Sequence, residues 1–344
     1  MKNYYLNNIY NTKLIPLKSQ LFFPYQNCQK ILLESHGLEY SELYINSSLS
    51  LNYNMKNNAI YSSYGSYSLL PFLESNVKQF YFDDNLEMVT EIFVQNIEYL
   101  TRNKQPIIVA VDSFYLNYSS NYKKKHSLHS IILCGYNLSE GKIYIVDFEN
   151  LYYVRRCVSL ENFLRARNSK FLCSTTLGTS KYINNNWSFI DKIQCIPDKK
   201  LFTELLKITI QNYDISNKNN YILTGIDALY CIKCIFTSSS TVKFYNNLYF
   251  NLLKISKRYI LFNEILDIYR NKINSLVLYD TINIINHQIY NWNYLLTCIK
   301  KYINNKNVNL LATVEREFNE LIENEKKLKL NIYKLYKEIN SEYY

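Results

Sequence analysis

Cys28 is the first residue whose type and surroundings suggest chemistry. It opens an apolar run that ends at Gly37, and glycine tolerates the positive φ that often ends a helix. We therefore predict a short buried helix of roughly two turns with Cys28 at its N-terminus. Unpaired N–H groups and the helix dipole would favour the thiolate there, and the thiolate is the reactive form of cysteine. Cys28 is thus a candidate nucleophile, although a buried cysteine is more often a small core residue.

A histidine and a carboxylate are placed to act on such a thiol. His129 opens the apolar run 129–137, Asp147 closes the run 142–147, and a glycine-containing turn lies between them. Two β-branched and aromatic runs around such a turn predict a hairpin, and the hairpin brings His129 close to Asp147. A carboxylate that holds a histidine in one tautomer beside a cysteine is a nucleophile, base and orienter arrangement. We predict catalytic roles for Cys28, His129 and Asp147.

Other pairs of potential metal ligands have simpler structural explanations. Cys231 and Cys234 form a CxxC pair, but the surrounding residues have the pattern of a buried helix and no second pair completes a zinc site. His126 and His129 lie three residues apart at a junction of loop and strand, with no carboxylate ligand in register. Asp112 ends an apolar strand, and we favour a strand-end cap over a role in the site. We expect no metal and no cofactor.

The composition is that of a globular protein with a basic surface. The chain has 344 residues, 48% of them hydrophobic, and a formal charge of +10, so it is long enough for two domains and attracts acidic partners. Without an RNA-binding signature or zinc-finger spacing, an acidic carrier protein is favoured over nucleic acid. Residues 1–17 lack the apolar core of a signal peptide, and no apolar run reaches about 18 residues. We expect a cytoplasmic protein without a membrane partner and with eight free cysteines.

The hydrophobic periodicity predicts an α+β domain followed by a helical domain. We place the boundary at Pro197, which gives domains 1–197 and 198–344. The expected elements of the first domain, besides the cysteine helix and the hairpin, are strands at 42–46, 107–111, 171–176 and 192–196 and helices at 85–100 and 160–167. The expected helices of the second domain are 201–212, 224–236, 241–257, 259–271 and 279–302.

The last stretch of the chain has the most regular pattern. From residue 311 to residue 339 the apolar residues recur at spacings of three and four, with Glu325 as the one polar exception. This is a heptad seam, so we predict a long helix that packs along another helix, either within this chain or across a homodimer.

At this point the sequence resembles known families. The order of Cys28 at a helix start, His129 opening a strand and Asp147 closing the next strand is similar to that of papain-like cysteine peptidases. A closer likeness, to the butirosin biosynthesis protein H family, is carried by residues 27–38, PIIVAVDSFYLNY at 106–118, HSLH at 126–129 with the Gly-Tyr pair at 135–136, and SLENFLRAR at 159–167. The resemblance covers about residues 20 to 170 well and the helical remainder loosely.

The resemblance implies a papain-like fold that makes amide bonds. Members of the family take acyl groups from carrier-protein thioesters and pass them to amines, and a related enzyme does so in closthioamide assembly. The implied partners are an acyl or peptidyl carrier protein, whose phosphopantetheine presents the substrate, and a small amine such as a diamine or amino sugar. Papain-like enzymes place an oxyanion glutamine six residues before the cysteine, where this chain has Phe22; Gln20, Gln26 and Asn27 are the neighbouring candidates.

Three lysines precede the histidine strand, at Lys123, Lys124 and Lys125. Such a run is usually a solvated loop, but its position also suits the phosphate of a phosphopantetheine arm or an acidic carrier helix.

These observations favour an amide-forming acyltransferase of natural-product biosynthesis that needs no ATP. Cys28 would attack the thioester, His129 would move the protons, and an amine would accept the acyl group. Two alternatives remain open. A cysteine peptidase or thioesterase would use the same residues with water as the acceptor, and a non-catalytic helical scaffold would only bind a partner.

Overall fold

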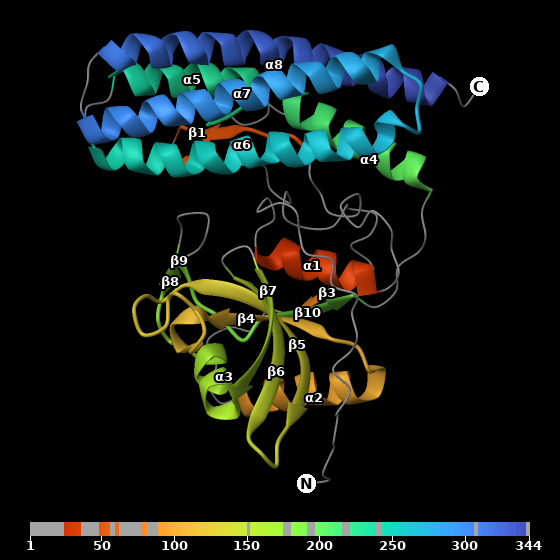
Figure 1. The fold of residues 1–344 in the computed structure, drawn as a ribbon, viewed down its shortest axis with the longest axis vertical. Helices are drawn as coiled ribbons and strands as arrows, with labels where there is room; N and C mark the ends of the chain where they lie inside the picture. The colour runs from red at the N-terminus through yellow and green to blue at the C-terminus, as the bar shows by residue number, and fades with distance from the viewer. Residues whose placement is uncertain are drawn as a thin grey trace. The chain divides into compact units, whose positions relative to one another are not determined.

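The computed structural model describes residues 24–35, 48–55, 59–61, 77–80, 89–149, 152–174, 180–190, 197–214, 221–238, 242–305 and 309–341. The chain divides into two compact units, Met1–Ile45 with Tyr67–Cys195, and Asn46–Ser66 with Ile196–Tyr344. The fold is α+β, with an antiparallel sheet in the first unit and mainly helices in the second, as predicted (Figure 1). The segment Asn46–Ser66 belongs to the helical unit, which differs from the contiguous division expected from the sequence.

The first unit is built on a six-stranded antiparallel sheet with the order β3-β10-β4-β5-β6-β7. In that order its strands are Val77–Phe80, Trp187–Ile190, Ile107–Asp112, Leu128–Asn137, Lys142–Glu149 and Tyr152–Ser159. The predicted hairpin is β5–β6, and Gly141 in its turn has a φ of +62°, a value that glycine adopts without strain. The pair β8 (Cys173–Ser174) and β9 (Ser180–Lys181) forms a separate two-stranded sheet. The strands expected at 42–46 and 192–196 lie outside the described residues.

Helices cover both faces of this sheet because its strands carry apolar residues on both sides. On one face, Val109 and Ile131 pack with residues of α2 (Val89–Asn103) and α3 (Leu160–Arg167) in one buried cluster. On the other face, Tyr25 of α1 (Pro24–Ser35) contacts Ser188 of β10 through a hydrogen bond of 3.1 Å between the two hydroxyls. The sheet is therefore enclosed on both sides, and the predicted helices at 85–100 and 160–167 are present as α2 and α3.

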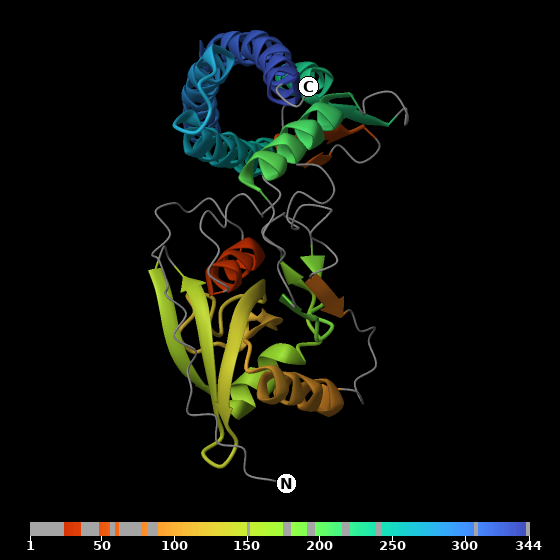
Figure 2. The same cartoon turned by 90° about the vertical axis from the view of Figure 1, so that its right-hand side faces the viewer.

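The second unit consists mainly of long helices that Figure 2 shows nearly end-on. Its helices are α4 (Asp198–Asp214), α5 (Gly225–Ser238), α6 (Val242–Arg270), α7 (Leu276–Asn305) and α8 (Asn309–Ser341). A small sheet of β11 (Ile222–Thr224), β1 (Asn52–Asn54) and β2 (Ala59–Tyr61) lies in the same unit. The two helices expected at 241–257 and 259–271 form the single helix α6, because neither proline nor glycine interrupts the sequence between them.

The heptad seam of α8 is buried by other helices of the same chain. Seven seam residues are at most 1% exposed, namely Val314, Phe318, Leu321, Leu328, Ile332, Leu335 and Ile339. The polar exception, Glu325, accepts hydrogen bonds from the Tyr213 and Tyr259 hydroxyls and from the Gln288 side-chain amide. The seam is thus filled within one chain, and the homodimer remains a prediction. None of the helices in the described part of the chain is long and apolar enough to cross a membrane.

Candidate active site

His129 and Asp147 lie together at one end of the β5–β6 hairpin. The Nε2 atom of His129 is 2.7 Å from Oδ1 of Asp147, so the proximity expected from the hairpin is present. The paired part of β5 and β6 begins with Ile132 opposite Val146, and His129 lies beyond it, where the strands separate. A carboxylate accepts hydrogen bonds, so Nε2 carries the proton in the neutral ring and Nδ1 is then the basic nitrogen.

Asp147 is fixed by two further donors. The Tyr118 hydroxyl donates to Oδ2 at 2.7 Å, and the Phe148 backbone N–H donates to Oδ1 at 2.5 Å. The side chain is 2% exposed, and burial by itself would raise its pKa, but His129 and the three hydrogen bonds outweigh burial and lower the pKa of Asp147. Asp147 is therefore an ionised orienting group at neutral pH. Tyr118 was missed at the sequence level, although it ends the run 106–118 that carries the family likeness.

The Cys28 thiol lies next to this pair. Its Sγ donates to the backbone carbonyl of Ser130, the residue that follows His129, at 3.4 Å. The thiol reaches this carbonyl because β5 and β6 have already separated there. The structure thus places Cys28 against the strand that carries His129, and the hydrogen bond that it shows for the thiol goes to the strand backbone.

Cys28 does not occupy the helix start that the sequence suggested. Helix α1 begins at Pro24, so Cys28 is in its second turn, beyond the unpaired N–H groups of the first turn. The residue is 3% exposed, and burial raises the pKa of its thiol well above the ordinary value, with the Asp147 carboxylate raising it further. The expected helix-stabilised thiolate is therefore wrong for this structure. Cys28 is a protonated thiol that requires a base to become a nucleophile.

Of the remaining predicted site residues that the structure describes, the two polar residues of α1 are buried and the three lysines are exposed. Gln26 and Asn27 are buried in the first turn of α1, at 0% and 5% exposure, while Gln20 lies outside the described residues. Lys124 and Lys125 are exposed in the loop before β5, as is Lys123, which has a φ of +53° and stands 5.2 Å from the centre of the Tyr122 ring. This is a solvated loop, and a contact with a carrier protein remains a prediction.

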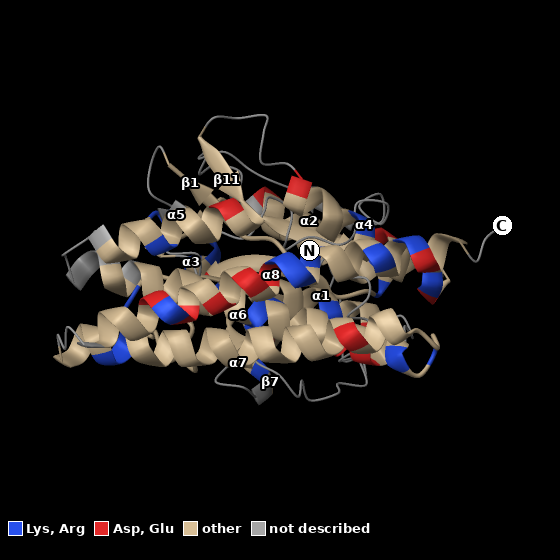
Figure 3. Cartoon of the chain, turned by 90° about the horizontal axis from the view of Figure 1, so that it is seen from above, with Lys and Arg blue, Asp and Glu red and all other residues tan. Residues whose placement is uncertain are grey.

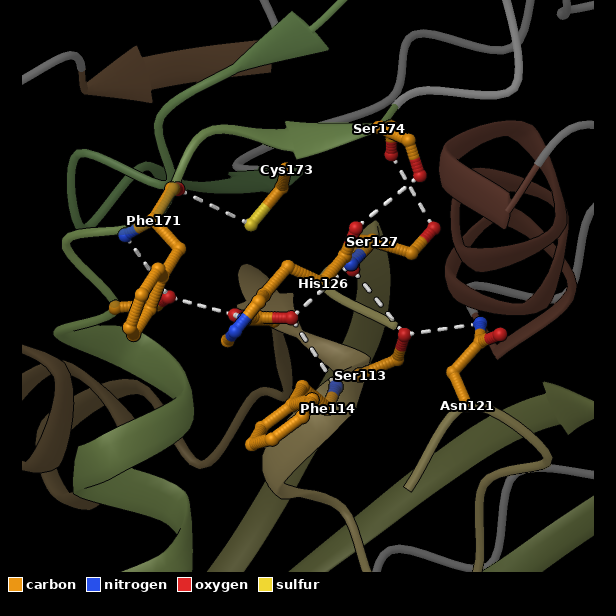
Figure 4. Close-up of polar contacts among 10 residues, drawn as sticks. Ser113, Phe114, Asn121, His126, Ser127, Phe171, Cys173 and Ser174 are labelled. Carbon is orange, nitrogen blue, oxygen red and sulfur yellow. Dashed lines mark hydrogen bonds and ion pairs between the residues drawn. The ribbon is translucent and has the colours of Figure 1, made fainter. Parts of the chain in front are cut away.

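Asp112 and His126 form a second carboxylate–imidazole pair, which the sequence reasoning did not anticipate (Figure 4). Asp112 caps the 3-10 helix η4 (Ser113–Tyr115), so the preference for a strand-end cap was correct. The same carboxylate also lies 2.6 Å from Nδ1 of His126. The pairing depends on the register of β4 against β5, where Asp112 is opposite Leu128, and the sequence did not give that register.

The other cysteines are free thiols where the structure describes them, namely Cys134, Cys157, Cys173, Cys231, Cys234 and Cys298 besides Cys28. The CxxC pair lies on helix α5 as predicted, but Cys231 is half-buried and Cys234 is exposed, so the expectation that the pair is part of the core is wrong. Burial and nearby Asp112 raise the pKa of Cys173 to about 12.

A separate groove lies in the helical unit between α6 and α7. It is lined by Tyr249, Leu253, Leu296 and the lysines Lys300 and Lys301, among others. Figure 3 shows the basic and acidic residues of these helices in blue and red. The described residues that line the groove include no cysteine, histidine or carboxylate, which are the groups that acyl transfer needs. The candidate active site is therefore the Cys28, His129 and Asp147 region.

The comparison with protein families fits this location. Residues 30–148 match the model of the family described as butirosin biosynthesis protein H, N-terminal. Over these residues, about a third of its length, the chain is similar to the butirosin biosynthesis protein H family. The matched segment contains His129 and Asp147 and begins two residues after Cys28. A search of curated proteins finds no significant match. The family indicates an acyltransferase-like enzyme of antibiotic biosynthesis, which confirms the resemblance seen in the sequence.

Proposed function

We propose that the chain is an amide-forming acyltransferase that takes an acyl group from the phosphopantetheine thioester of a carrier protein and passes it to a small amine. The observation that carries this proposal is that the Cys28 thiol bonds to the backbone of β5 beside His129, which is paired with Asp147 of β6. The family supports it, because an acyltransferase-like enzyme requires a nucleophile and a base of this kind.

In the first half-reaction, Nδ1 of His129 takes the proton of the Cys28 thiol. The sulfur then attacks the thioester carbon, the new C–S bond forms, and the bond to the pantetheine sulfur breaks. His129 returns the proton to the departing thiolate, which leaves a neutral thiol and an acyl-enzyme on Cys28. Asp147 stabilises the imidazolium that exists between the two proton transfers. The raised pKa of Cys28 makes this base essential, because the thiol does not ionise on its own at neutral pH.

In the second half-reaction, an amine attacks the acyl-enzyme. The C–N bond forms, the C–S bond to Cys28 breaks, and the proton from the amine reaches the Cys28 sulfur through His129. The overall change converts a thioester and an amine into an amide and a thiol. The thioester already carries the activation, so neither ATP nor a cofactor takes part.

Intact-mass spectrometry with an acylated carrier protein tests the proposal. The parent chain should gain the mass of the acyl group, Cys28→Ala should gain none, and an added amine should convert the acyl-enzyme to amide without ATP. Cys28→Ser, which keeps the size of the side chain, should lose amide formation by several orders of magnitude while folding is retained. Cys157→Ala, at an exposed thiol, is the matched control and should behave like the parent.

Three outcomes would contradict the proposal. Rapid hydrolysis with no amide at saturating amine would indicate a thioesterase, and cleavage of a peptide bond would indicate a peptidase. No covalent adduct with any thioester would indicate a binding scaffold.

A further inference from the structure

Three exposed apolar side chains gather beside the start of β5. Phe171, Leu172 and Tyr182 are 52%, 56% and 46% exposed, and the first two are consecutive residues before β8. Tyr182 follows Lys181, the register partner of Cys173, so Leu172 and Tyr182 lie at the same end of the β8–β9 pair. The other large apolar residues that are exposed in the described part of the first unit lie apart, one on α2 and one in the β5–β6 turn. Exposed apolar side chains that cluster in this way mark an interaction site, whereas scattered ones do not.

A stack of three rings joins these apolar residues to the loop that carries the lysines. The His126 ring lies between Phe171 and Phe114, with ring centroids 3.9 Å and 4.1 Å away and interplanar angles of 17° and 20° (Figure 4). The Phe114 carbonyl accepts from the backbone N–H of Lys123 at 3.0 Å. On the side of β8, the Ser174 N–H donates to the His126 carbonyl at 3.1 Å. The apolar residues and the lysine loop are therefore parts of one surface.

The buried carboxylate of Asp112 fixes this surface from below. The Asp112 side chain is 0% exposed, and its Oδ1 accepts from the backbone N–H groups of Phe114 and Ser127, both at 3.1 Å. Its Oδ2 accepts from the Ser169 hydroxyl at 2.6 Å and lies 2.6 Å from Nδ1 of His126. One carboxylate thus ties together η4, the start of β5 and the segment before β8. A surface that is already ordered loses little conformational entropy when a partner binds.

The rim of the surface is basic. Five exposed lysines belong to the same segments, namely Lys123, Lys124, Lys125, Lys170 and Lys181. Together with Phe171, Leu172 and Tyr182 they form what we call the β8 surface. The stretches 113–139 and 162–190, which supply all of these residues, contain no aspartate or glutamate. An apolar centre with a basic rim is complementary to an acidic partner that carries apolar side chains among its carboxylates.

We infer that the β8 surface is the docking site for an acidic helix of the carrier protein. The inference rests on the proposed function and defines where the partner of that function binds. Apolar side chains of the helix cover Phe171, Leu172 and Tyr182, and its carboxylates lie against the lysines. Nucleic acid fits less well, because Phe114 and Phe171 already stack on His126 and do not offer these ring faces to bases.

The docked carrier protein does not need to touch Cys28. A carrier protein presents its thioester at the end of a long, flexible phosphopantetheine arm, so docking and acyl transfer take place at separate points. His126 precedes His129 by three residues of largely extended chain, roughly 10 Å at about 3.3 Å per residue. The β8 surface therefore lies at the end of β5 that carries His129, and the arm spans the remaining distance to the thiol.

Rates of Cys28 acylation from two donors test the inference in the full-length chain. The donors are an acyl group on the phosphopantetheine of an acidic acyl carrier protein and the same acyl group on free pantetheine. Leu172→Glu places a negative charge at the centre of the β8 surface and should lower kcat/KM for the carrier about 10-fold, with no change for acyl-pantetheine. Val94→Glu, at an apolar residue of α2 that is 47% exposed, is the matched control and should behave like the parent.

The salt dependence separates the apolar centre from the basic rim. The double variant Lys170→Glu with Lys181→Glu should lower kcat/KM for the carrier most at low salt, and the loss should shrink as salt screens the charges. Leu172→Ala removes apolar contact area alone, so its smaller loss should be the same at every salt concentration. Arg102→Glu with Lys104→Glu makes an equal change of charge at exposed residues at the end of α2 and is the control.

Binding of the same carrier protein, followed by fluorescence anisotropy, reports docking without chemistry. Parent-like binding and acylation in Leu172→Glu, or equal losses with both donors, would overturn the inference. Parent-like carrier use by variants that lose binding to RNA or to anionic vesicles would also overturn it and assign the surface to that other partner. If the parent binds the carrier through this surface but forms no acyl-enzyme with either donor, the inference holds and the proposed function fails.

Discussion

Replacing Asp147 by asparagine isolates the charge that supports His129. The carboxylate accepts from Nε2 of His129 at 2.7 Å, from the Tyr118 hydroxyl at 2.7 Å and from the Phe148 N–H at 2.5 Å. An asparagine retains one oxygen for His129 and Phe148, and its amide N–H₂ can donate to the Tyr118 oxygen. Asp147→Asn therefore removes the negative charge with little change in shape, and the fold should persist.

The expected loss of acyl-transfer rate follows from the weakened hydrogen bond between His129 and residue 147. A hydrogen bond to a charged group contributes about 1.5–3 kcal/mol, and about 1.4 kcal/mol corresponds to a factor of ten in rate. Asp147→Asn should thus slow acyl transfer by roughly 10- to 150-fold if this bond is the main loss. Tyr118→Phe removes one hydrogen bond to the carboxylate but leaves its charge and its hydrogen bond to His129, so it should slow transfer less than Asp147→Asn does.

The assay is the rate of Cys28 acylation, followed by intact mass across a range of pH. Without the carboxylate the His129 imidazolium loses its counter-charge, so the acid limb of the pH–rate profile should move to lower pH in Asp147→Asn. Tyr118→Phe should move the limb little. Parent-like rates and an unshifted profile in Asp147→Asn would refute the assignment of Asp147 as the group that orients and stabilises His129.

Further predictions concern the stability of each unit and the carrier protein. Glu325→Ala should lower the free energy of unfolding by about 3–5 kcal/mol, because three buried donors lose their acceptor, and Glu325→Gln should cost less; a parent-like denaturation midpoint for the alanine variant would contradict this. Because the pKa of Asp147 is lowered in the folded protein, its carboxylate stabilises the fold above about pH 3.9, and this stability is lost as the pH falls through the lowered pKa. The free energy of unfolding of Asp147→Asn, measured by denaturation at several pH values, should therefore fall less steeply in acid than that of the parent. Burial raises the pKa of Glu325, so its contribution is present below about pH 4.3 and is lost as pH rises through the raised pKa; Glu325→Gln should reduce this loss in pH-dependent denaturation. Exchanging Lys123, Lys124 and Lys125 for glutamate should raise the KM for the carrier protein, more at low salt, and leave a small synthetic thioester unaffected; equal effects on both substrates would exclude steering.

Local patterns predicted the elements that place the site. The β5–β6 hairpin follows from two apolar runs around a glycine turn, and α3 begins and ends where its sequence indicates. The start of α1 was misplaced because the prediction began the helix at the apolar run after Cys28. Pro24 is the overlooked signal, since proline is favoured in the first helical turn. The helix begins four residues before the predicted start. Cys28 is therefore a buried thiol and not the thiolate that a helix start would stabilise.

Local sequence patterns could not predict the contacts between segments that lie far apart in the chain. Asp112 looked like a strand-end cap, and its contact with His126 requires the register of β4 against β5. Glu325 was visible as a polar break in a heptad seam. Its three donors, however, come from three other helices, and only the packed unit brings them to one carboxylate. Periodicity assigns such residues to an element but does not assign their partners.

The topology of the sheet explains why two acid–histidine pairs form near the start of one strand. Strand β5 runs antiparallel to both of its neighbours, so its first residues lie beside the last residues of β4 and of β6. Each neighbour has an aspartate near its end, Asp112 on β4 and Asp147 on β6, and the start of β5 provides His126 and His129 in turn. The thiol of Cys28 reaches β5 at the next residue, on the side where β6 has separated from it. One strand start therefore carries two histidines with separate carboxylate partners, and the Cys28 thiol contacts the same strand one residue after His129.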